Sequence, residues 1–251
     1  MILDEIIRRT EKRVAKLPDT FPDPEISTHA SLIDAIHEAR GKNAIIAEIK
    51  CASPSRGIIR RNVDMAMMAR VLVDGGCVGL SILTEPYFFG GTLQDVARVK
   101  NAVHVPVLRK DFIIDERQIG ETRALGADAV LLIASVLGEH LPAFVEASFE
   151  AGLEPLVEVH SPQDINSALA TRACLIGINN RNLSTLAIDR STTRLLSEQV
   201  RLGGRTIVSE SGMRSADDVR EMKSYCDAFL IGSSIMADAE PKKKLEEFVC
   251  A

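Results

Sequence analysis

The chain has 251 residues, which is long enough for one large α/β barrel or for two smaller domains. Hydrophobic residues make up 46% and charged residues 26% of it, as in a globular protein with a sizeable core. The net charge of −5 argues against general nucleic-acid binding, although a locally basic pocket could still bind a small anion.

The first forty residues predict two helices that precede the main body of the chain. Residues 2–17 have amphipathic spacing, the sequence TFPDPEIS at 20–27 interrupts it, and residues 31–40 have helical spacing again. We interpret residues 1–40 as a helical extension that packs on the remainder. We expect residues 1–251 to form a single domain.

Eight short apolar runs rich in β-branched residues follow: 44–49, 78–83, 105–109, 128–133, 155–159, 175–178, 206–210 and 227–232. Segments with helical spacing lie between them, such as 64–74, 93–101, 116–126, 141–152 and 216–224. This alternation predicts parallel strands joined by helical crossovers. Eight such units in roughly 250 residues are typical of a (β/α)8 TIM barrel. A doubly wound sheet with one misassigned strand is the alternative.

The first strand ends in two charged residues, Glu48 and Lys50. Side chains alternate along a strand, so both charges lie on one face and a uniformly apolar set lies on the other. If the apolar face meets the surrounding helices, the two charges point to the mouth of the barrel. Taken alone, the pair could equally be a surface salt bridge.

Other predicted strands also end in polar residues: Lys110, then Glu158, then Asn179, Asn180 and Arg181, then Glu210 and Ser211. In a barrel, active-site residues project from the carboxyl ends of the strands, and these ends meet at one rim. Many charges at one rim would be costly unless they met a ligand or one another. The convergence therefore predicts a functional site.

The loops after the last two strands predict a phosphate site. Ser211 and Gly212 follow one strand, and Gly232 and Ser233 follow the next. Glycine lets backbone N–H groups approach an anion, and a helix N-terminus adds a favourable dipole. These two loops are the usual phosphate site of this fold. The first strand neighbours the eighth in a closed barrel, so Ser53 could contribute from the other side.

The five cysteines are scattered, without a CxxC pair or metal-ligand spacing. We therefore expect reduced thiols, no metal site and a cytoplasmic location. The charged N-terminus does not resemble a secretory signal, and no apolar run is long enough to predict a membrane span.

Seven segments resemble, in order, the signature segments of the indole-3-glycerol phosphate synthase family: AEIKCASPSRG, SILTEPYFFGG, VPVLRKDFIID, EPLVEVH, IGINNRNL, VSESG and FLIGSSIM. The resemblance covers essentially the whole chain. It departs mildly at Arg56, where the family often has lysine, and at residues 86–87 in a variable loop. It implies that 1-(2-carboxyphenylamino)-1-deoxyribulose 5-phosphate closes to indole-3-glycerol phosphate with loss of carbon dioxide and water, in tryptophan synthesis. No metal or organic cofactor is implied.

The resemblance also implies roles for the polar residues. Lys110 matches the general acid of ring closure, and a lysine near carboxylates should stay protonated. Glu158, Glu48 and Lys50 are candidates for the remaining proton transfers, with no individual assignment. The implied substrate-binding residues are Ser53, Gly212, Gly232 and Ser233 at the phosphate, Asn179 and Arg181 as an orienting pair, Phe89 at the anthranilate ring, Ser211 and Glu210.

Several assignments have alternatives. Phe89 could simply cover the rim, Glu210 could be a partner of the lysines or a strand-end charge, and Arg56 could only brace its loop. His104 and His160 do not match catalytic positions of the family, so we expect both at the surface.

Two other functions fit parts of the pattern. A Schiff-base aldolase would need a neutral Lys110, which nearby carboxylates oppose. A non-catalytic phosphate-ligand sensor would need the phosphate loops without the acids. The expected partner is a small phosphorylated anion, with no nucleic acid or membrane, and we expect a monomer.

Overall fold

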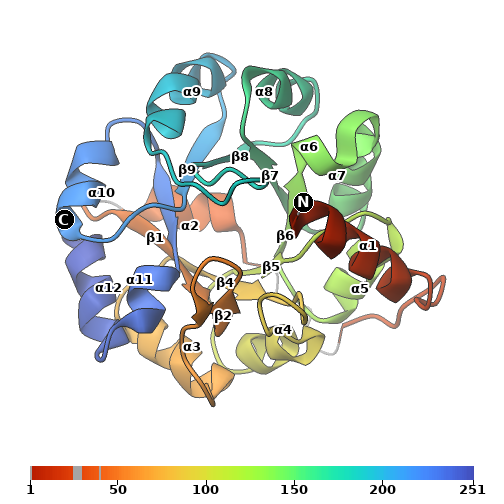
Figure 1. Ribbon diagram of the computed structural model, residues 1–251, viewed down its shortest axis with the longest axis horizontal. Coiled ribbons are helices and arrows are strands. Elements are labelled where there is room, and N and C mark those ends of the chain that lie inside the picture. The colour runs from red at the N-terminus through yellow and green to blue at the C-terminus, as the bar shows by residue number, and fades with distance from the viewer. Residues whose placement is uncertain (1, 25–29, 40) are drawn as a thin grey trace.

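The computed structural model describes residues 2–24, 30–39 and 41–251. At its centre lies a closed barrel of eight parallel strands in the order β1-β10-β9-β8-β7-β6-β5-β4 (Figure 1). The strands are β1 (Ala44–Ile49), β4 (Gly79–Leu83), β5 (Val107–Lys110), β6 (Ala129–Ile133), β7 (Glu154–Val159), β8 (Leu175–Asn179), β9 (Thr206–Glu210) and β10 (Ala228–Ile231). The predicted TIM barrel is confirmed. Pairing of β1 with both β10 and β4 closes the sheet and excludes the doubly wound alternative.

Helices surround the barrel on its outer side (Figure 1). They are α3 (Met65–Asp74), α4 (Leu93–Lys100), α5 (Arg117–Ala124), α6 (Ala134–Leu137), the 3-10 helix η1 (Gly138–His140), α7 (Leu141–Glu150), α8 (Pro162–Leu169), α9 (Ser191–Leu202), α10 (Ala216–Met222), α11 (Ser233–Ala237) and α12 (Pro241–Val249). Side-chain caps define several of their starts. Ser161 accepts a hydrogen bond from the backbone N–H of Asp164 in α8, and Ser215 from that of Asp218 in α10, which satisfies an otherwise unpaired donor in each helix.

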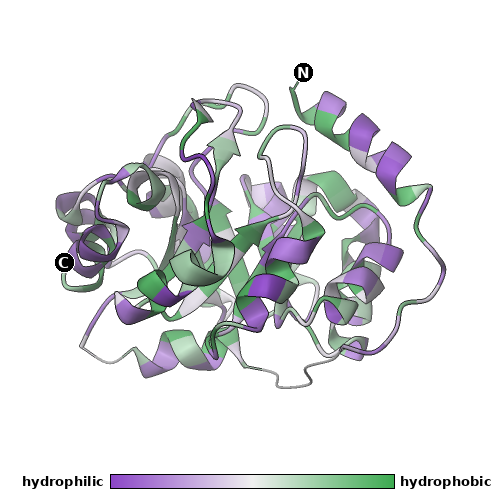
Figure 2. Cartoon of the chain, turned by 90° about the horizontal axis from the view of Figure 1, so that it is seen from below, coloured by the Kyte–Doolittle hydropathy of each residue, from purple (hydrophilic) through white to green (hydrophobic). Residues whose placement is uncertain are grey.

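The core has two layers, and the alternation of side chains along the strands separates them. Ile45, Ala47 and Ile49 of β1 pack between the strands and the helices, whereas Ala44 and Ile46 fill the barrel interior. In Figure 2 the strands and the inner sides of the helices are largely hydrophobic, and the outer sides of the helices are hydrophilic. Interior-facing positions at the carboxyl ends of the strands therefore open into the barrel mouth, as expected for Glu48.

The two N-terminal helices lie at opposite ends of the barrel. Helix α1 (Ile2–Val14) crosses the mouth side (Figure 2), where Arg13 bonds both oxygens of Asp111 just after β5, at 2.9 and 2.8 Å. Helix α2 (Leu32–Glu38) packs at the other end, where the Leu32 N–H donates to Glu154 at the start of β7. The helices are shorter than the predicted 2–17 and 31–40. Residues 1, 25–29 and 40 of the predicted extension lie outside the described residues.

A short hairpin follows β1, formed by β2 (Ala52–Ser53) and β3 (Gly57–Ile58). The sequence did not predict it, because two residues are too few for a recognisable strand pattern.

Across the described ranges, no helix has the length and apolarity that a membrane crossing requires.

Candidate active site

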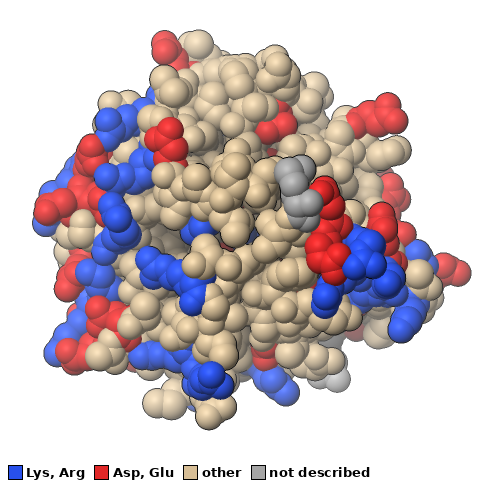
Figure 3. Space-filling model, in the orientation of Figure 1, with Lys and Arg blue, Asp and Glu red and all other residues tan. Residues whose placement is uncertain are grey.

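A cavity of about 500 Å³ opens at the carboxyl ends of the barrel strands. The predicted residues that line it are Glu48, Lys50, Arg56, Phe89, Lys110, Glu158, Asn179, Arg181, Ser211, Gly212, Gly232 and Ser233. Figure 3 shows this face, with basic side chains beside the hollow at its centre. Glu48 and Ser233, which lie 185 positions apart in the chain, thus share one cavity.

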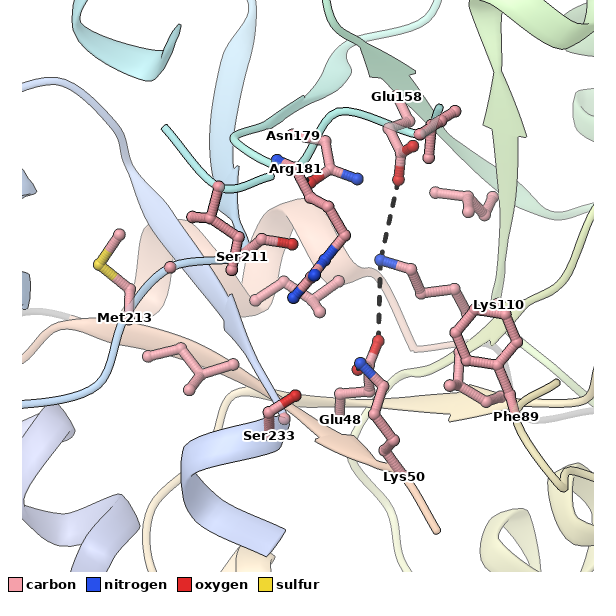
Figure 4. A pocket seen from close by; sticks show the side chains of 18 of the residues that line it. Glu48, Lys50, Phe89, Lys110, Glu158, Asn179, Arg181, Ser211, Met213 and Ser233 are labelled. Atoms are coloured by element: carbon pink, nitrogen blue, oxygen red, sulfur yellow. Dashed lines mark hydrogen bonds and ion pairs between the residues drawn. The ribbon is translucent and has the colours of Figure 1, made fainter. Parts of the chain in front are cut away.

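Lys110 extends from the end of β5 toward carboxylates from three other strands, two of which, Glu48 and Glu158, are seen in Figure 4. Its Nζ lies 2.5 Å from Oε2 of Glu210, 3.7 Å from Oε2 of Glu48 and 3.8 Å from Oε2 of Glu158. Burial alone would lower the pKa of Lys110, but the three carboxylates outweigh burial and raise the pKa above its ordinary value. Lys110 is therefore an ammonium group with acid–base partners around it.

Glu210 is fully buried at the end of β9 and does not itself line the cavity. Of the two interpretations left open, the geometry matches a partner of Lys110. Burial raises the pKa of Glu210 to about 7 against the opposing effect of Lys110, and the neighbouring Glu158 and Glu48 act in the same direction as burial. Gly177 on β8 makes room for this side chain, because a Cβ at that position would lie 2.1 Å from Oε1 of Glu210.

Glu48 and Lys50 form an ion pair on the cavity face of β1, with both side chains largely buried. Burial would raise the pKa of Glu48, but Lys50, Lys110 and Arg181 together lower it below its ordinary value. Gly232 follows β10 on the neighbouring strand, where a Cβ would approach Glu48 Oε1 to 2.6 Å. Glu48 is therefore an anion that contacts two lysines.

The turn after β9 has an unusual backbone. Ser211 and Gly212 both have positive φ, 66° and 96°. A non-glycine residue in this region is uncommon and indicates a local constraint. Gly232 precedes the first turn of α11, whose N-terminal N–H groups begin at Ser233. Strands β9 and β10 are neighbours, so both glycine loops border the same part of the cavity.

Ser53 lies apart from these two loops. The β2–β3 hairpin carries it into an adjoining cavity of about 60 Å³, which also contains Phe89, Phe112 and Arg181. Its Oγ is buried and has no hydrogen-bond partner within the described part of the chain. Ser53 therefore lines the adjoining cavity, whereas Gly212, Gly232 and Ser233 line the main one.

Asn179 and Arg181 stand together at the end of β8. The Arg181 N–H donates to Asn179 Oδ1 at 3.0 Å, and the guanidinium donates to Ser55 Oγ at 3.3 Å. Arg181 thus reaches across the mouth from the β8 side to the loop after β1 (Figure 4). On the other side of the cavity, Phe89 packs against Phe112 with ring centroids 6.3 Å apart.

The expected surface position is correct for His104, which is exposed, and wrong for His160. The His160 side chain is 16% exposed, and its Nε2 lies 3.4 Å from Oε1 of Glu158. Its position two residues after Glu158, on the same strand face, was the available signal.

Arg190 also lines the cavity and was not predicted. Its aliphatic part packs beside Gly212, and its guanidinium pairs with Asp218 and Glu221 of α10. Because it lies in an irregular loop, no strand or helix pattern marked it.

In the described ranges, no group of three or more His, Cys, Asp or Glu side chains is arranged to hold a metal ion.

Comparisons with known proteins give one consistent family. The family model described as indole-3-glycerol phosphate synthase matches residues 3–248. An indole-3-glycerol phosphate synthase of Thermoanaerobacter sp. (strain X514) is 40% identical over 255 residues, which cover 99% of this chain and 97% of that protein. One from Geobacillus thermodenitrificans (strain NG80-2) is 39% identical and covers 96% and 94%.

Solved structures share the fold at low sequence identity. The tryptophan synthase alpha chain from Legionella pneumophila subsp. pneumophila superposes with a TM-score of 0.65 at 12% identity, covering 88% of this chain and 96% of that chain. A ligand-free tryptophan synthase structure from M. tuberculosis gives 0.66 at 14% identity, covering 88% and 98%. At these identities the likeness concerns the barrel alone.

Proposed function

The chain belongs to the indole-3-glycerol phosphate synthase family and catalyses that family's lyase reaction in tryptophan biosynthesis, and we propose that Lys110, Glu158, Glu48 and Lys50 carry out its chemistry. The substrate is a small phosphorylated molecule. We assign it as 1-(2-carboxyphenylamino)-1-deoxyribulose 5-phosphate, which loses carbon dioxide and water as the indole ring closes.

Ring closure requires an acid at the ketone oxygen. The aromatic carbon that bears the carboxylate attacks the ketone carbon, and the electron pair of the C=O bond moves to oxygen. The Lys110 ammonium donates a proton to that oxygen as its charge develops. The contacts of Lys110 Nζ with three carboxylates are the observation that carries this role, because they keep the lysine charged.

Loss of carbon dioxide then restores the aromatic ring, because the electrons of the broken C–C bond return to it. Arg181, with its forked donors, and Asn179 are suited to orienting the carboxylate before it leaves. Dehydration follows. One group protonates the departing hydroxyl, and another removes the carbon-bound proton so that the indole double bond forms. Glu48, Lys50 and Glu158 are the cavity groups assigned to these two transfers.

The phosphate end of the substrate is assigned to the glycine loops. Backbone N–H groups at Gly212 and Gly232, together with Ser233 at the start of α11, favour an anion there. Phe89 is assigned to the anthranilate ring, and Ser211 to a hydrogen bond with the substrate. We also assign Ser53 to the phosphate, and it would act from the adjoining cavity that it lines.

Lys110 between carboxylates argues against the Schiff-base alternative, which needs a neutral amine. The two carboxylates that line the cavity, Glu48 and Glu158, argue against a sensor that only binds phosphate.

We also propose that residues 1–251 form one domain and that residues 1–40 pack on the barrel as an extension. The bonds of Arg13 and Leu32 to the barrel support this for the described part of that segment. We propose a cytoplasmic monomer without nucleic-acid or membrane partners. Light scattering after gel filtration should give the mass of one chain, and a larger mass would contradict the monomer.

The reaction can be tested by following indole fluorescence and carbon dioxide with the purified protein. We expect one carbon dioxide per indole product, and the same rate with a metal chelator present. Borohydride added during turnover should leave no adduct on Lys110. Absence of turnover would overturn the substrate assignment, inhibition by the chelator would overturn the cofactor-free reaction, and an adduct would overturn the acid role.

A further inference from the structure

His160 and Glu158 form a buried contact that the mechanism above does not use. Nε2 of His160 lies 3.4 Å from Oε1 of Glu158, which is longer than an ordinary hydrogen bond. Among the described residues, neither this oxygen nor either nitrogen of the ring has a hydrogen-bond partner. Buried polar groups are normally paired, so these atoms are the natural partners of one another.

The position of His160 is fixed by its backbone. Its N–H donates to Asp164 Oδ2 at 2.9 Å, and the Asp164 N–H donates to Ser161 Oγ, which caps α8. The ring therefore stands at a defined place beyond the end of β7, on the strand face that Glu158 occupies.

The charge state of His160 follows from the groups that face it. Burial lowers its pKa below the ordinary 6.5 and Lys110 of β5 acts in the same direction. Asp164 of α8 and Glu210 of β9 oppose this, but burial outweighs them. Glu158 of β7 also faces the ring, at 3.4 Å from Nε2. At neutral pH the ring is uncharged, so one of its nitrogens still carries a hydrogen.

The two oxygens of Glu158 face different groups. Oε1 faces the His160 ring at 3.4 Å, and Oε2 faces Lys110 Nζ at 3.8 Å (Figure 4 shows the second contact). A carboxylate that accepts a hydrogen bond through one oxygen presents the other in a defined direction. His160 can therefore control which way the acid–base oxygen of Glu158 points.

We propose that His160 is a positioning residue, whose Nε2–H donates to Oε1 of Glu158 and holds Oε2 toward Lys110 and the substrate. This inference rests on the proposed catalytic role of Glu158. No proton leaves the histidine during the cycle. A small rotation of the ring shortens the contact when substrate fills the cavity, as catalytic hydrogen bonds often tighten in the bound state.

The test compares His160→Phe, which removes the donor, with His160→Gln, whose amide can donate from a similar place. We expect His160→Phe to lower kcat about ten- to a hundredfold with little change in KM, since misplaced catalytic groups cost that much. His160→Gln should recover most of kcat. His104→Phe makes the same change at an exposed site and should match the wild type. Unfolding curves verify that each variant is folded.

The pH profile separates positioning from packing. Protonation of His160 occurs below pH 6.5 and alters the charge beside Glu158, so wild-type kcat should change there. His160→Gln should lack that change. A profile identical in both enzymes would overturn the proposal.

A double-mutant comparison distinguishes the inference from the function on which it rests. In Glu158→Gln enzyme, adding His160→Phe should cause no further loss, because the acid–base carboxylate that His160 positions is gone. If the two losses multiply, or if His160→Phe alone keeps wild-type kcat while Glu158→Gln is impaired, the positioning role is wrong. If Glu158→Gln itself keeps wild-type kcat, the proposed role of Glu158 fails and the inference fails with it.

Discussion

Glu48 and Glu210 are both buried and both face Lys110, yet their pKa values move in opposite directions. Burial raises the pKa of each. For Glu48, the cations of Lys50, Lys110 and Arg181 outweigh burial, and its pKa falls. For Glu210, burial prevails and the pKa is about 7. The site therefore combines an anion and a cation with a buried carboxyl whose pKa lies above its ordinary value, which suits a reaction with several proton transfers.

Ser233 tests the phosphate assignment at the scale of one side chain. We expect Ser233→Asp to raise KM about tenfold or more and to change kcat little, because a carboxylate would repel the phosphate in ground and transition state alike. Steady-state kinetics measure both constants. Ser224→Asp is the control, because it makes the same change at an exposed serine that does not line the cavity, and both constants should stay at the wild-type values. An unchanged KM in Ser233→Asp would remove Ser233 from the phosphate site.

At the scale of strands and loops, the regular elements were predictable and the irregular ones were not. The strand patterns predicted how the side chains of β1 alternate between its two faces and which residues lie at each strand end, because β-branched runs and period two follow directly from strand geometry. The β2–β3 hairpin displaces Ser53, and the loop after β8 brings in Arg190. Such segments follow local hydrogen bonds and tertiary contacts that no periodicity encodes.

Gly177 shows how a strand makes room for a side chain of the next strand. Gly177→Ala should lower kcat about tenfold or more, because the new Cβ would lie 2.1 Å from Glu210 Oε1 and displace that carboxylate from Lys110. KM should change little, since Gly177 does not line the cavity. Kinetics with an unfolding curve measure this. Wild-type kcat in a folded Gly177→Ala protein would show that the position of Glu210 is unimportant.

The junction between α1 and the barrel depends on a buried carboxylate. Asp111 is fully buried and accepts hydrogen bonds from Arg13, Arg109 and Thr84. Asp111→Ala leaves the fully buried Arg109 without one of its anions, so we expect the free energy of unfolding to fall by about 3–5 kcal/mol.

Asp115→Ala is the matched control for Asp111→Ala, because it breaks a partly exposed pair with Arg117. It should cost less than about 1 kcal/mol. Urea unfolding at equilibrium gives both values. Equal losses in the two variants would contradict a special contribution of the buried network.

At the scale of the whole molecule, closure of the barrel creates the site. Lys110 and Glu210 lie 100 residues apart in the chain and meet because β5 and β9 face one interior. The eight-strand pattern was enough to predict this convergence. Distances and charge states were not predictable, since they depend on how far each side chain reaches into the mouth and how deeply it is buried. His160 is the clearest case, because the family resemblance assigned it no catalytic position and its burial beside Glu158 follows only from the structure.

The central claim is that Lys110, held as an ammonium group by three carboxylates, is the acid of ring closure. The direct measurement is the rate of indole-3-glycerol phosphate formation by Lys110→Ala beside wild type and Lys16→Ala, an exposed lysine of the N-terminal segment. We predict a loss of at least about 10³-fold in kcat for Lys110→Ala, within the range for a missing acid–base group, and wild-type kinetics for Lys16→Ala. A folded Lys110→Ala protein that retained wild-type kcat would contradict the account.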